Sequence, residues 1–388
     1  MKKRILIVGG GIAGTSLACF LDEKQFDITI AERFAEWKPI GYVVGLWQNG
    51  IRVLEKYDIY SELRNKGVIA QYQDTLDEKG NVLKKVSFEK LNQEFGATIH
   101  FFHRADLHKA LMNKAQNKVT LKLNTFLENL IFEQKSVRVL FNTNESIEYD
   151  LVVGADGIHS SVRSFISPQN SLFTYPSTFF SFLAEVPENI RGSIEMFGVG
   201  SFFGIYPYDD KKVGIYCSLH NKTAQTISKW NELPNFEKIR TAFQYYQGLV
   251  PTILKQLNEN TPIFQDSVRE VEFSPWFCGN AICIGDAAHA LLPTTGQGVA
   301  AAIQDAYHLA NLLNKNVGSH HFEKIFSDFE NMRTKHLTPI RKSSRFVNKL
   351  IVNPYALVCV MRNFAAKHVK FYDTENKIRS FFQATQID

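Results

Sequence analysis

The first 33 residues constrain the fold of this chain more than any other segment. A short apolar run at residues 4–10 leads into the glycine pattern Gly9-x-Gly11-x-x-Gly14, and residues 11–24 carry apolar side chains at helical spacing. A second apolar run follows at residues 27–33. This order of segments predicts a strand–helix–strand unit that opens a parallel sheet.

The glycine pattern predicts a dinucleotide site at the turn between the first strand and the helix. Gly9 permits the tight turn, Gly11 lets the backbone approach a pyrophosphate, and Gly14 lets the helix pack closely on the sheet. The helix N-terminus offers free N–H groups and the positive end of its dipole to the phosphates. Glu32, at the end of the second strand, is placed to bind a ribose hydroxyl pair. It argues against a ribose 2′-phosphate, although Arg33 would soften that repulsion. The pattern alone fits FAD and NAD(P) equally.

Two Gly-Asp turns lie much further along the chain. Gly154-Ala155-Asp156-Gly157 ends the apolar run 151–153, and Gly285-Asp286-Ala287-Ala288-His289 ends the apolar run 281–284. Each could bind a ligand through its aspartate or only cap the helix that follows. In the capping interpretation, Arg163 pairs with Asp156 and His289 makes a local hydrogen bond.

The three motifs together, in this order, resemble the flavin-dependent monooxygenases of the p-hydroxybenzoate hydroxylase type over residues 4–350. The resemblance implies an α/β fold with a Rossmann-like FAD-binding domain, an interleaved β-sheet substrate domain and C-terminal helices. The corresponding ranges are 1–171 for the FAD-binding domain with inserted segments, 172–275 for the substrate domain, 276–320 for the return to the first domain, and 321–388 for the helical region. We also expect helices at 50–66, 105–116, 298–314 and 322–349, and a helical insertion at 235–258.

The resemblance also implies the cofactor site. It places Asp156 and Arg163 near FAD and the nicotinamide nucleotide, and Asp286 on the ribityl or ribose hydroxyls. It brings residues 293–298 to the flavin ring and has Arg104 contact the flavin. The expected FAD-binding residues are Gly9, Gly11, Ile12, Ala13, Gly14, Glu32, Arg33, Arg104, Asp156, Arg163, Asp286, Pro293, Gly296, Gly298 and Val299.

The activity that the resemblance implies is hydroxylation of an aromatic or polycyclic small molecule by O2, with NAD(P)H as reductant and a flavin hydroperoxide as the oxygen donor. The candidates for a catalytic hydrogen-bond partner in the pocket are Tyr206, Tyr216, His220 and Gln48, with Phe203 as a pocket residue. Alternation along residues 202–206 puts Phe203 on the opposite face from Tyr206, and leaves open which face meets the pocket.

The same motifs are also compatible with other functions. An antibiotic-inactivating oxygenase of the tetracycline type, or an epoxidase, would share the scaffold. A non-catalytic flavin- or isoprenoid-binding protein is the alternative from another class. The flavin-dependent halogenases are disfavoured because the chain has no Trp-x-Trp-x-Ile-Pro run.

Composition limits the kinds of partner that the chain is expected to bind. The net charge of +5 has no basic block beyond residues 341–345, so we expect no nucleic-acid partner. The five scattered cysteines predict reduced thiols, a cytoplasmic protein and no metal site. No apolar run reaches the ~18 residues of a membrane span. The apolar stretch 350–360 is expected to pack as a terminal helix or turn, with contact to a membrane surface as the alternative. We expect a monomer or a homodimer.

Overall fold

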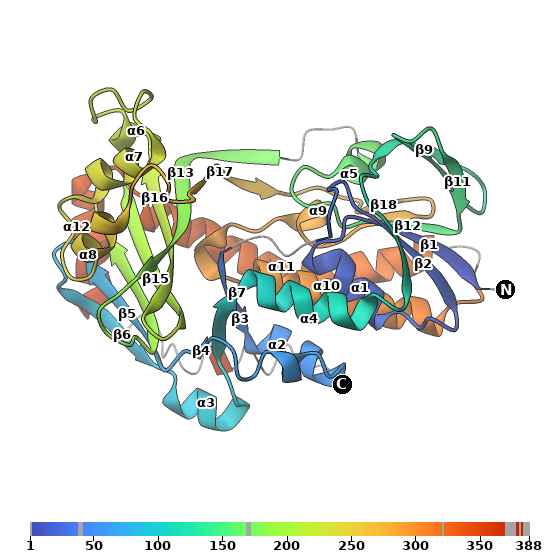
Figure 1. The fold of residues 1–388 in the computed structure, drawn as a ribbon, viewed down its shortest axis with the longest axis horizontal. Coiled ribbons are helices and arrows are strands. Elements are labelled where there is room, and N and C mark those ends of the chain that lie inside the picture. The colour runs from blue at the N-terminus through green and yellow to red at the C-terminus, as the bar shows by residue number, and fades with distance from the viewer. Residues whose placement is uncertain are drawn as a thin grey trace.

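Two β-sheets at opposite ends of the molecule organise the chain. The computed structural model describes residues 2–37, 42–167, 172–319, 322–368, 378–379 and 382. One sheet has six strands and the other has seven. Figure 1 shows the first near the N-terminus and the second at the other end, with long helices between them. This arrangement agrees with the predicted α/β fold with an interleaved sheet region.

The six-stranded sheet is built around the first strand. Its order is β18 (Phe277–Cys278), β19 (Ala281–Cys283), β12 (Leu151–Gly154), β1 (Lys3–Val8), β2 (Phe26–Ala31) and β8 (Val119–Lys122). β1 pairs in parallel with both β2 and β12, and only β18 runs antiparallel to its neighbour. Because parallel strands end at the same edge, the glycine turn and both Gly-Asp turns meet there.

Helix α1 (Ile12–Phe20) is shorter than the predicted helix 11–24. Its C-cap residue, Leu21, is already extended, and the polar segment after it turns back toward β2. In that turn, the carboxylate of Asp22 accepts a hydrogen bond from the backbone N–H of Lys24. The side-chain–backbone bond competes with helix continuation and ends the helix early.

The seven-stranded sheet has the order β17 (Phe264–Val271), β13 (Leu172–Glu185), β16 (Lys212–His220), β15 (Ser201–Asp209), β14 (Gly192–Phe197), β5 (Tyr72–Asp77) and β6 (Val82–Ser87). β5 and β6 come from the N-terminal part of the chain, and β5 pairs in parallel with β14. They form an inserted segment within the range 1–171. β13 also pairs along β17, and this ribbon runs toward the other sheet in Figure 1.

Helices cover the outer face of the seven-stranded sheet. The predicted insertion at 235–258 forms α7 (Asn235–Phe243) and α8 (Val250–Gln256), after the short α6 (Asn221–Ala224). Phe180, Phe203 and Phe243 are fully buried in the core between the sheet and these helices. The inner face of the sheet is therefore free to border a cavity.

Two smaller sheets and several helices complete the fold. They comprise the sheet of β3 (Val43–Trp47), β7 (Ile99–His103) and β4 (Val68–Ile69), the sheet of β9 (Leu127–Phe132), β10 (Val137–Phe141) and β11 (Ser146–Tyr149), and helices α2 (Gln48–Lys56), η1 (Tyr60–Glu62), α3 (Glu89–Phe95), α4 (Arg104–Ala115) and α5 (Ser161–Ile166). The single helix predicted at 50–66 is wrong, because α2 ends at Lys56. Asp58 has a left-handed φ of 55°, which a continuous helix does not accommodate.

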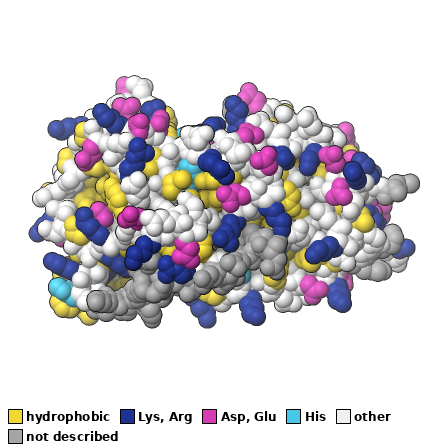
Figure 2. Space-filling view, turned by 90° about the horizontal axis from the view of Figure 1, so that it is seen from below, with side chains coloured by type: hydrophobic (Ala, Val, Ile, Leu, Met, Phe, Trp, Pro, Cys, Tyr) yellow, Lys and Arg dark blue, Asp and Glu magenta, His cyan; other side chains and the backbone are white. Residues whose placement is uncertain are grey.

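The C-terminal third supplies α9 (Asp286–His289), η2 (Pro293–Thr295), α10 (Gly298–Lys315), α11 (Glu323–Ile351) and α12 (Ala356–His368). Buried alanines on α10 allow α1 and α2 to pack closely against it. Stretch 350–360 packs on one side only: Cys359 is buried, whereas Leu357 and Val360 are exposed. Among the described residues, no helix has the length and apolar character needed to cross a bilayer. On the face drawn in Figure 2, positive and negative side chains are interspersed.

Candidate functional site

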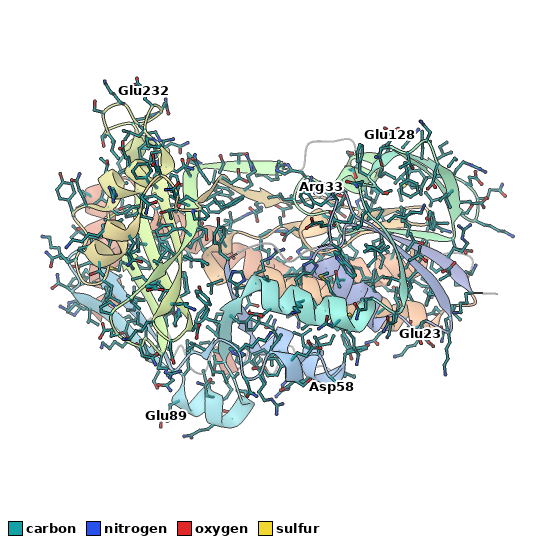
Figure 3. All side chains as sticks on the ribbon, in the orientation of Figure 1. Glu23, Arg33, Asp58, Glu89, Glu128 and Glu232 are labelled. Carbon is teal, nitrogen blue, oxygen red and sulfur yellow. The ribbon has the colours of Figure 1, made fainter. Side chains whose placement is uncertain are left out.

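A cavity of about 1820 Å³ lies between the two sheets. It is lined by the glycine turn, the loop after β2, the start of α4, the Asp156 turn, Asp286, Leu291, residues 293–299, one side of α11, and the inner face of the seven-stranded sheet. The expected FAD-binding residues found in its wall are Gly9, Gly11, Ile12, Ala13, Glu32, Arg33, Arg104, Asp156, Asp286, Pro293, Gly296, Gly298 and Val299. Gly14 and Arg163 are not in the wall. Figure 3 shows Arg33 toward the middle of the long axis of the molecule.

The three glycines of the first turn play different steric roles. Gly9 has φ +103°, and a Cβ there would lie 2.6 Å from the carbonyl oxygen of Ala155. A Cβ at Gly14 would collide with the carbonyl oxygen of Gly9, whereas one at Gly11 would meet no protein atom within 4 Å. Gly11 therefore borders open cavity, and no side chain caps the N-terminus of α1 beside it. The free N–H groups of this helix end suit an anion.

Glu32 is held beside this turn by backbone donors. Its carboxylate accepts hydrogen bonds from Gly10 N at 2.8 Å and Phe34 N at 3.1 Å. The carbonyl oxygen of the same Gly10 accepts bonds from Trp37 Nε1 at 2.8 Å and His108 Nε2 at 2.6 Å. Burial lowers the pKa of His108, which favours the neutral ring with its proton on Nε2. Sequence analysis missed Trp37 and His108 because neither belongs to a motif.

Asp286 and Arg104 interact electrostatically within the cavity wall, although they come from distant segments. Asp286 opens α9, directly after Gly285 at φ +59°. Its side chain is exposed to the cavity. Desolvation by the surrounding protein raises the pKa of its carboxyl group, and the charges of His289 and Arg104 oppose this shift. Burial lowers the pKa of Arg104, and Asp286 opposes that shift. Polar ligand groups could bind between these two side chains.

A buried ion cluster supports the Asp286 turn from behind. The Asp305 carboxylate accepts hydrogen bonds from His289 Nε2 at 2.5 Å, Gly285 N at 2.8 Å and Arg333 Nε at 2.6 Å. Burial alone would raise the pKa of Asp305, but His289 and Arg333 outweigh it and hold this pKa far below its usual range. His289 thus hydrogen bonds within the protein as expected, but its partner is not local: Asp305 lies on α10.

At the other Gly-Asp turn, one of the two predicted residues, Asp156, faces the cavity, and the other, Arg163, does not. The Asp156 carboxylate accepts hydrogen bonds from Ser161 N at 2.7 Å and Ser161 Oγ at 2.8 Å, so it caps α5 while it also faces the cavity. Arg163 is buried and donates to the carbonyl oxygens of Ala287 at 2.9 Å and Ile158 at 2.6 Å. Its guanidinium thus joins α5 to α9 and lies outside the cavity wall. We do not propose Arg163 further as a cofactor contact.

The N-terminus of α10 faces the cavity without a side-chain cap. Gly296 adopts the left-handed conformation at φ +63°, and a Cβ at Gly298 would meet no atom within 4 Å. Behind this segment, Thr294 Oγ1 donates to the carbonyl oxygen of Ser344 on α11 at 3.1 Å. The positive end of the α10 dipole is therefore open to an electron-rich ligand and is fixed in place.

On the sheet side, the structure separates the predicted pocket residues. Tyr206 and Tyr216 line the cavity, whereas Phe203 points to the opposite face and packs against Phe243. The face of the strand that carries Tyr206 is therefore the one that meets the cavity, a point that alternation in the sequence had left open.

Gln48 and His220 also lie outside the cavity wall. Gln48 is 2% exposed and donates through Nε2 to the carbonyl oxygen of Phe95 at 2.6 Å. His220 Nδ1 accepts from Lys222 N at 3.1 Å and so caps α6. Both side chains satisfy local backbone groups, so we no longer propose a catalytic role for them.

Residues 2–340 match the family model of the FAD binding domain. This chain belongs to that family of FAD-dependent monooxygenases. It is therefore an oxidoreductase that binds FAD, and the non-catalytic alternative falls away.

Two curated relatives illustrate the range of the family. This monooxygenase is 26% identical to the 2-heptyl-3-hydroxy-4(1H)-quinolone synthase of Pseudomonas aeruginosa, over 79% of this chain and 80% of the relative. It is 25% identical to the 6-hydroxynicotinate 3-monooxygenase of Pseudomonas fluorescens, over 88% of this chain and 90% of the relative. Among solved structures, Klebsiella pneumoniae HpxO complexed with FAD and uric acid superposes with a TM-score of 0.83 at 17% identity. That superposition covers 99% of this chain and 96% of HpxO, and it shows the shared fold.

The described residues of the monooxygenase fit FAD. Two uncapped helix ends, on α1 and α10, open into one cavity, and Gly11 and Gly298 leave space in front of them. Carboxylates suited to hydroxyl groups stand along the same wall. Within the described ranges, no group of three or more His, Cys, Asp or Glu side chains is placed to hold a metal ion.

Proposed function

We propose that this monooxygenase hydroxylates an aromatic or polycyclic small molecule, using NAD(P)H as reductant. In the overall reaction, the substrate, O2, NAD(P)H and a proton give the hydroxylated product, water and NAD(P)+. The observation that carries the proposal is the single cavity, in which the open N-terminus of α10 and a wall of aromatic and polar sheet residues are both present.

The size of the cavity supports a site for two ligands. Pockets for one small ligand occupy roughly 300–1,000 Å³. At about 1820 Å³, this cavity has room for a dinucleotide and a substrate together. The half beside the six-stranded sheet suits the dinucleotide, and the half beside the seven-stranded sheet suits a flat ring.

Each part of the cavity wall has a proposed task. The N–H groups of α1 beside Gly11 bind the pyrophosphate, and Glu32 binds the ribose hydroxyls of the adenosine. Asp286 and Arg104 hold the central part of the cofactor, and residues 293–299 position the flavin ring. Bound FAD supplies the redox chemistry, accepting electrons from NAD(P)H and activating O2. The sheet residues orient the substrate ring and exclude water from it.

The function is tested by NADH and NADPH oxidation with the FAD-loaded protein against phenols, aromatic acids, quinolones, purines and tetracyclines. We expect at least one compound to stimulate oxidation and to gain the mass of one oxygen atom. A tetracycline or an alkene as the only accepted compound would favour the antibiotic-inactivating or epoxidase alternative. Reduced FAD that yields only hydrogen peroxide with every compound would contradict a hydroxylase.

We further propose that the enzyme acts as a monomer or homodimer in the cytoplasm. Support comes from its five free cysteines, four of them buried, which suit a reducing compartment. Light scattering of the purified protein measures the mass of the assembly.

A further inference from the structure

The inner face of the seven-stranded sheet carries a group of polar side chains where it borders the cavity, beside Phe197 and Phe202. Alternate residues along five strands contribute polar side chains to it, and the opposite face is apolar core. The polar members are Gln73, Thr75, Ser181, Ser193, Glu195, Tyr206 and Tyr216. Sequence analysis missed Glu195 because no motif marks it and because its neighbour Gln73 comes from β5, far away in the chain.

Glu195 is the one ionisable acid in this part of the wall, among the described residues. No lysine or arginine of the described sheet lines the cavity, and no salt bridge to Glu195 is found among the described residues. The cations of the wall come from outside this sheet: they are Arg33, Arg104, and Arg333 and Lys335 of α11. Any charge on Glu195 thus lacks a fixed counter-ion on the sheet.

The neighbours of Glu195 are neutral hydrogen-bond donors. Tyr206 Oη donates to Glu195 Oε1 at 3.3 Å, longer than the usual 2.7–2.8 Å for such a bond. The amide of Gln73 also hydrogen bonds to this carboxyl group. Burial raises the pKa of Glu195, and these two donors oppose the shift. Burial also raises the pKa of Tyr206, so its hydroxyl keeps its proton.

A glycine makes this arrangement possible. Glu195 lies opposite Gly204 in the β14–β15 pair. A Cβ at Gly204 would lie 2.5 Å from Tyr206 Oη, so only glycine leaves room for the ring to fold back toward Glu195. The Tyr206 ring also packs against Phe101, with centroids 5.5 Å apart. The carboxyl group and its tyrosine are therefore held in one geometry beside aromatic walls.

We propose that Glu195, positioned with Tyr206, anchors a ring substrate that points an O–H or N–H donor at its carboxyl group and carries no carboxylate. The inference rests on the proposed function of this cavity as a hydroxylase site. A donor on the substrate satisfies a carboxyl oxygen that the protein bonds only weakly. A substrate carboxylate would instead meet a like charge with no cation on the sheet to offset it. The hydrogen bond also raises the electron density of the ring, which favours attack by an electrophilic oxygen.

Equilibrium binding to the oxidised, FAD-loaded protein tests this inference without turnover. The probes are three matched rings: 2-naphthol has the donor, 2-methoxynaphthalene lacks it, and 3-hydroxy-2-naphthoate adds a carboxylate. Their binding is followed by the change in flavin absorbance. We expect 2-naphthol to bind the wild-type protein about tenfold more tightly than either of the other two probes.

The variant Glu195→Gln keeps the shape of the side chain and removes its charge. We expect it to bind 3-hydroxy-2-naphthoate about tenfold more tightly than the wild type does, and to lose most of the preference for 2-naphthol. Glu185→Gln removes an exposed carboxylate on β13 that lies outside the cavity wall, so it is the control and should keep the wild-type ranking. FAD content and the unfolding midpoint establish that each variant is folded.

The proposal is overturned if the wild type binds the naphthoate as tightly as the naphthol, if 2-naphthol does not bind, or if Glu195→Gln leaves the ranking unchanged. These outcomes are separate from failure of the proposed function, which is read from oxygen incorporation. If the preference for 2-naphthol depends on Glu195 but no compound is hydroxylated, the proposed role of Glu195 stands and the proposed hydroxylase function is refuted.

Discussion

Glu32 shows how one side chain can hold a turn and still serve a ligand. Its carboxylate bonds to two backbone N–H groups, and it also lines the cavity. A carboxylate has about four acceptor sites, so these two bonds leave capacity for ribose hydroxyl groups. The same residue therefore shapes the turn and keeps acceptor sites for the ribose contact that we propose.

Replacing Glu32 by Gln should weaken FAD binding. The variant loses a charge-assisted bond of about 1.5–3 kcal/mol, which corresponds to roughly a 10- to 100-fold rise in the Kd of FAD. Fluorescence titration of the apoprotein with FAD measures this change. Glu23→Gln, at an exposed position, is the control and should bind FAD as the wild type does. An unchanged Kd for Glu32→Gln would remove this residue from the site.

At the scale of elements, helix α1 depends on glycines of two kinds. Gly14 lets the helix lie against its own turn, because a Cβ there would strike the carbonyl oxygen of Gly9. Gly11 faces open cavity. Gly14 therefore serves packing, and Gly11 leaves space for the ligand that we propose, although the sequence pattern presents the two alike.

Alanine substitutions should separate these two roles. Gly14→Ala forces the helix away from the sheet, and we expect a loss of about 1–3 kcal/mol in the unfolding free energy of the apoprotein. Gly11→Ala should leave that free energy within about 0.5 kcal/mol and weaken FAD binding, because its methyl group projects into the cavity. Urea unfolding of the apoproteins and FAD titration give the two readouts. Equal destabilisation by both changes would contradict the distinction.

At the scale of the whole molecule, α11 connects the two ends of the cavity. Ser344 of α11 accepts a hydrogen bond from Thr294 beside the α10 terminus. One residue further on, Arg345 donates to the buried carboxylate of Glu270 on β17 at 2.8 Å. The flavin-side loop and the seven-stranded sheet are therefore fixed to the same helix, which keeps the two halves of the site in register.

Stability should fall in mild acid because the fold buries neutral histidines. His100 is 1% exposed, and burial lowers its pKa to about 4, although a hydrogen bond with the carbonyl oxygen of Lys66 opposes the shift. The unfolded chain binds a proton near pH 6.5 and the folded chain only near pH 4, so stability is full above pH 6.5 and declines between these values. His100 alone should contribute a loss of about 3 kcal/mol by pH 4.

Urea unfolding between pH 4 and pH 7 measures this dependence. The variant His100→Gln should show a shallower decline than the wild type, whatever its stability at pH 7. His159→Gln, at an exposed position, should follow the wild-type slope. Parallel curves for the wild type and His100→Gln would show that His100 is not the source.

Local patterns predicted a large part of the molecule. The glycine turn, the strands around it and the Gly-Asp turns depend on steric limits within a few residues, which composition and spacing express directly. Most of the expected FAD-binding residues accordingly lie in one cavity wall. The helix at 50–66 was predicted wrongly because apolar spacing does not register the left-handed Asp58.

Only the tertiary structure decided which side chains face that cavity. Gln48, Arg163 and His220 satisfy nearby backbone groups, and no local pattern distinguishes such a partner from a ligand. Glu195 gains its surroundings from the pairing of β14 with β5, over 100 residues apart in the chain. The sequence by itself indicated the family and the cofactor, through its resemblance to known flavin monooxygenases. It also predicted the turns of the proposed FAD side, because these turns rest on short-range geometry. The substrate half depends on long-range strand pairing, which appears only when the chain is folded.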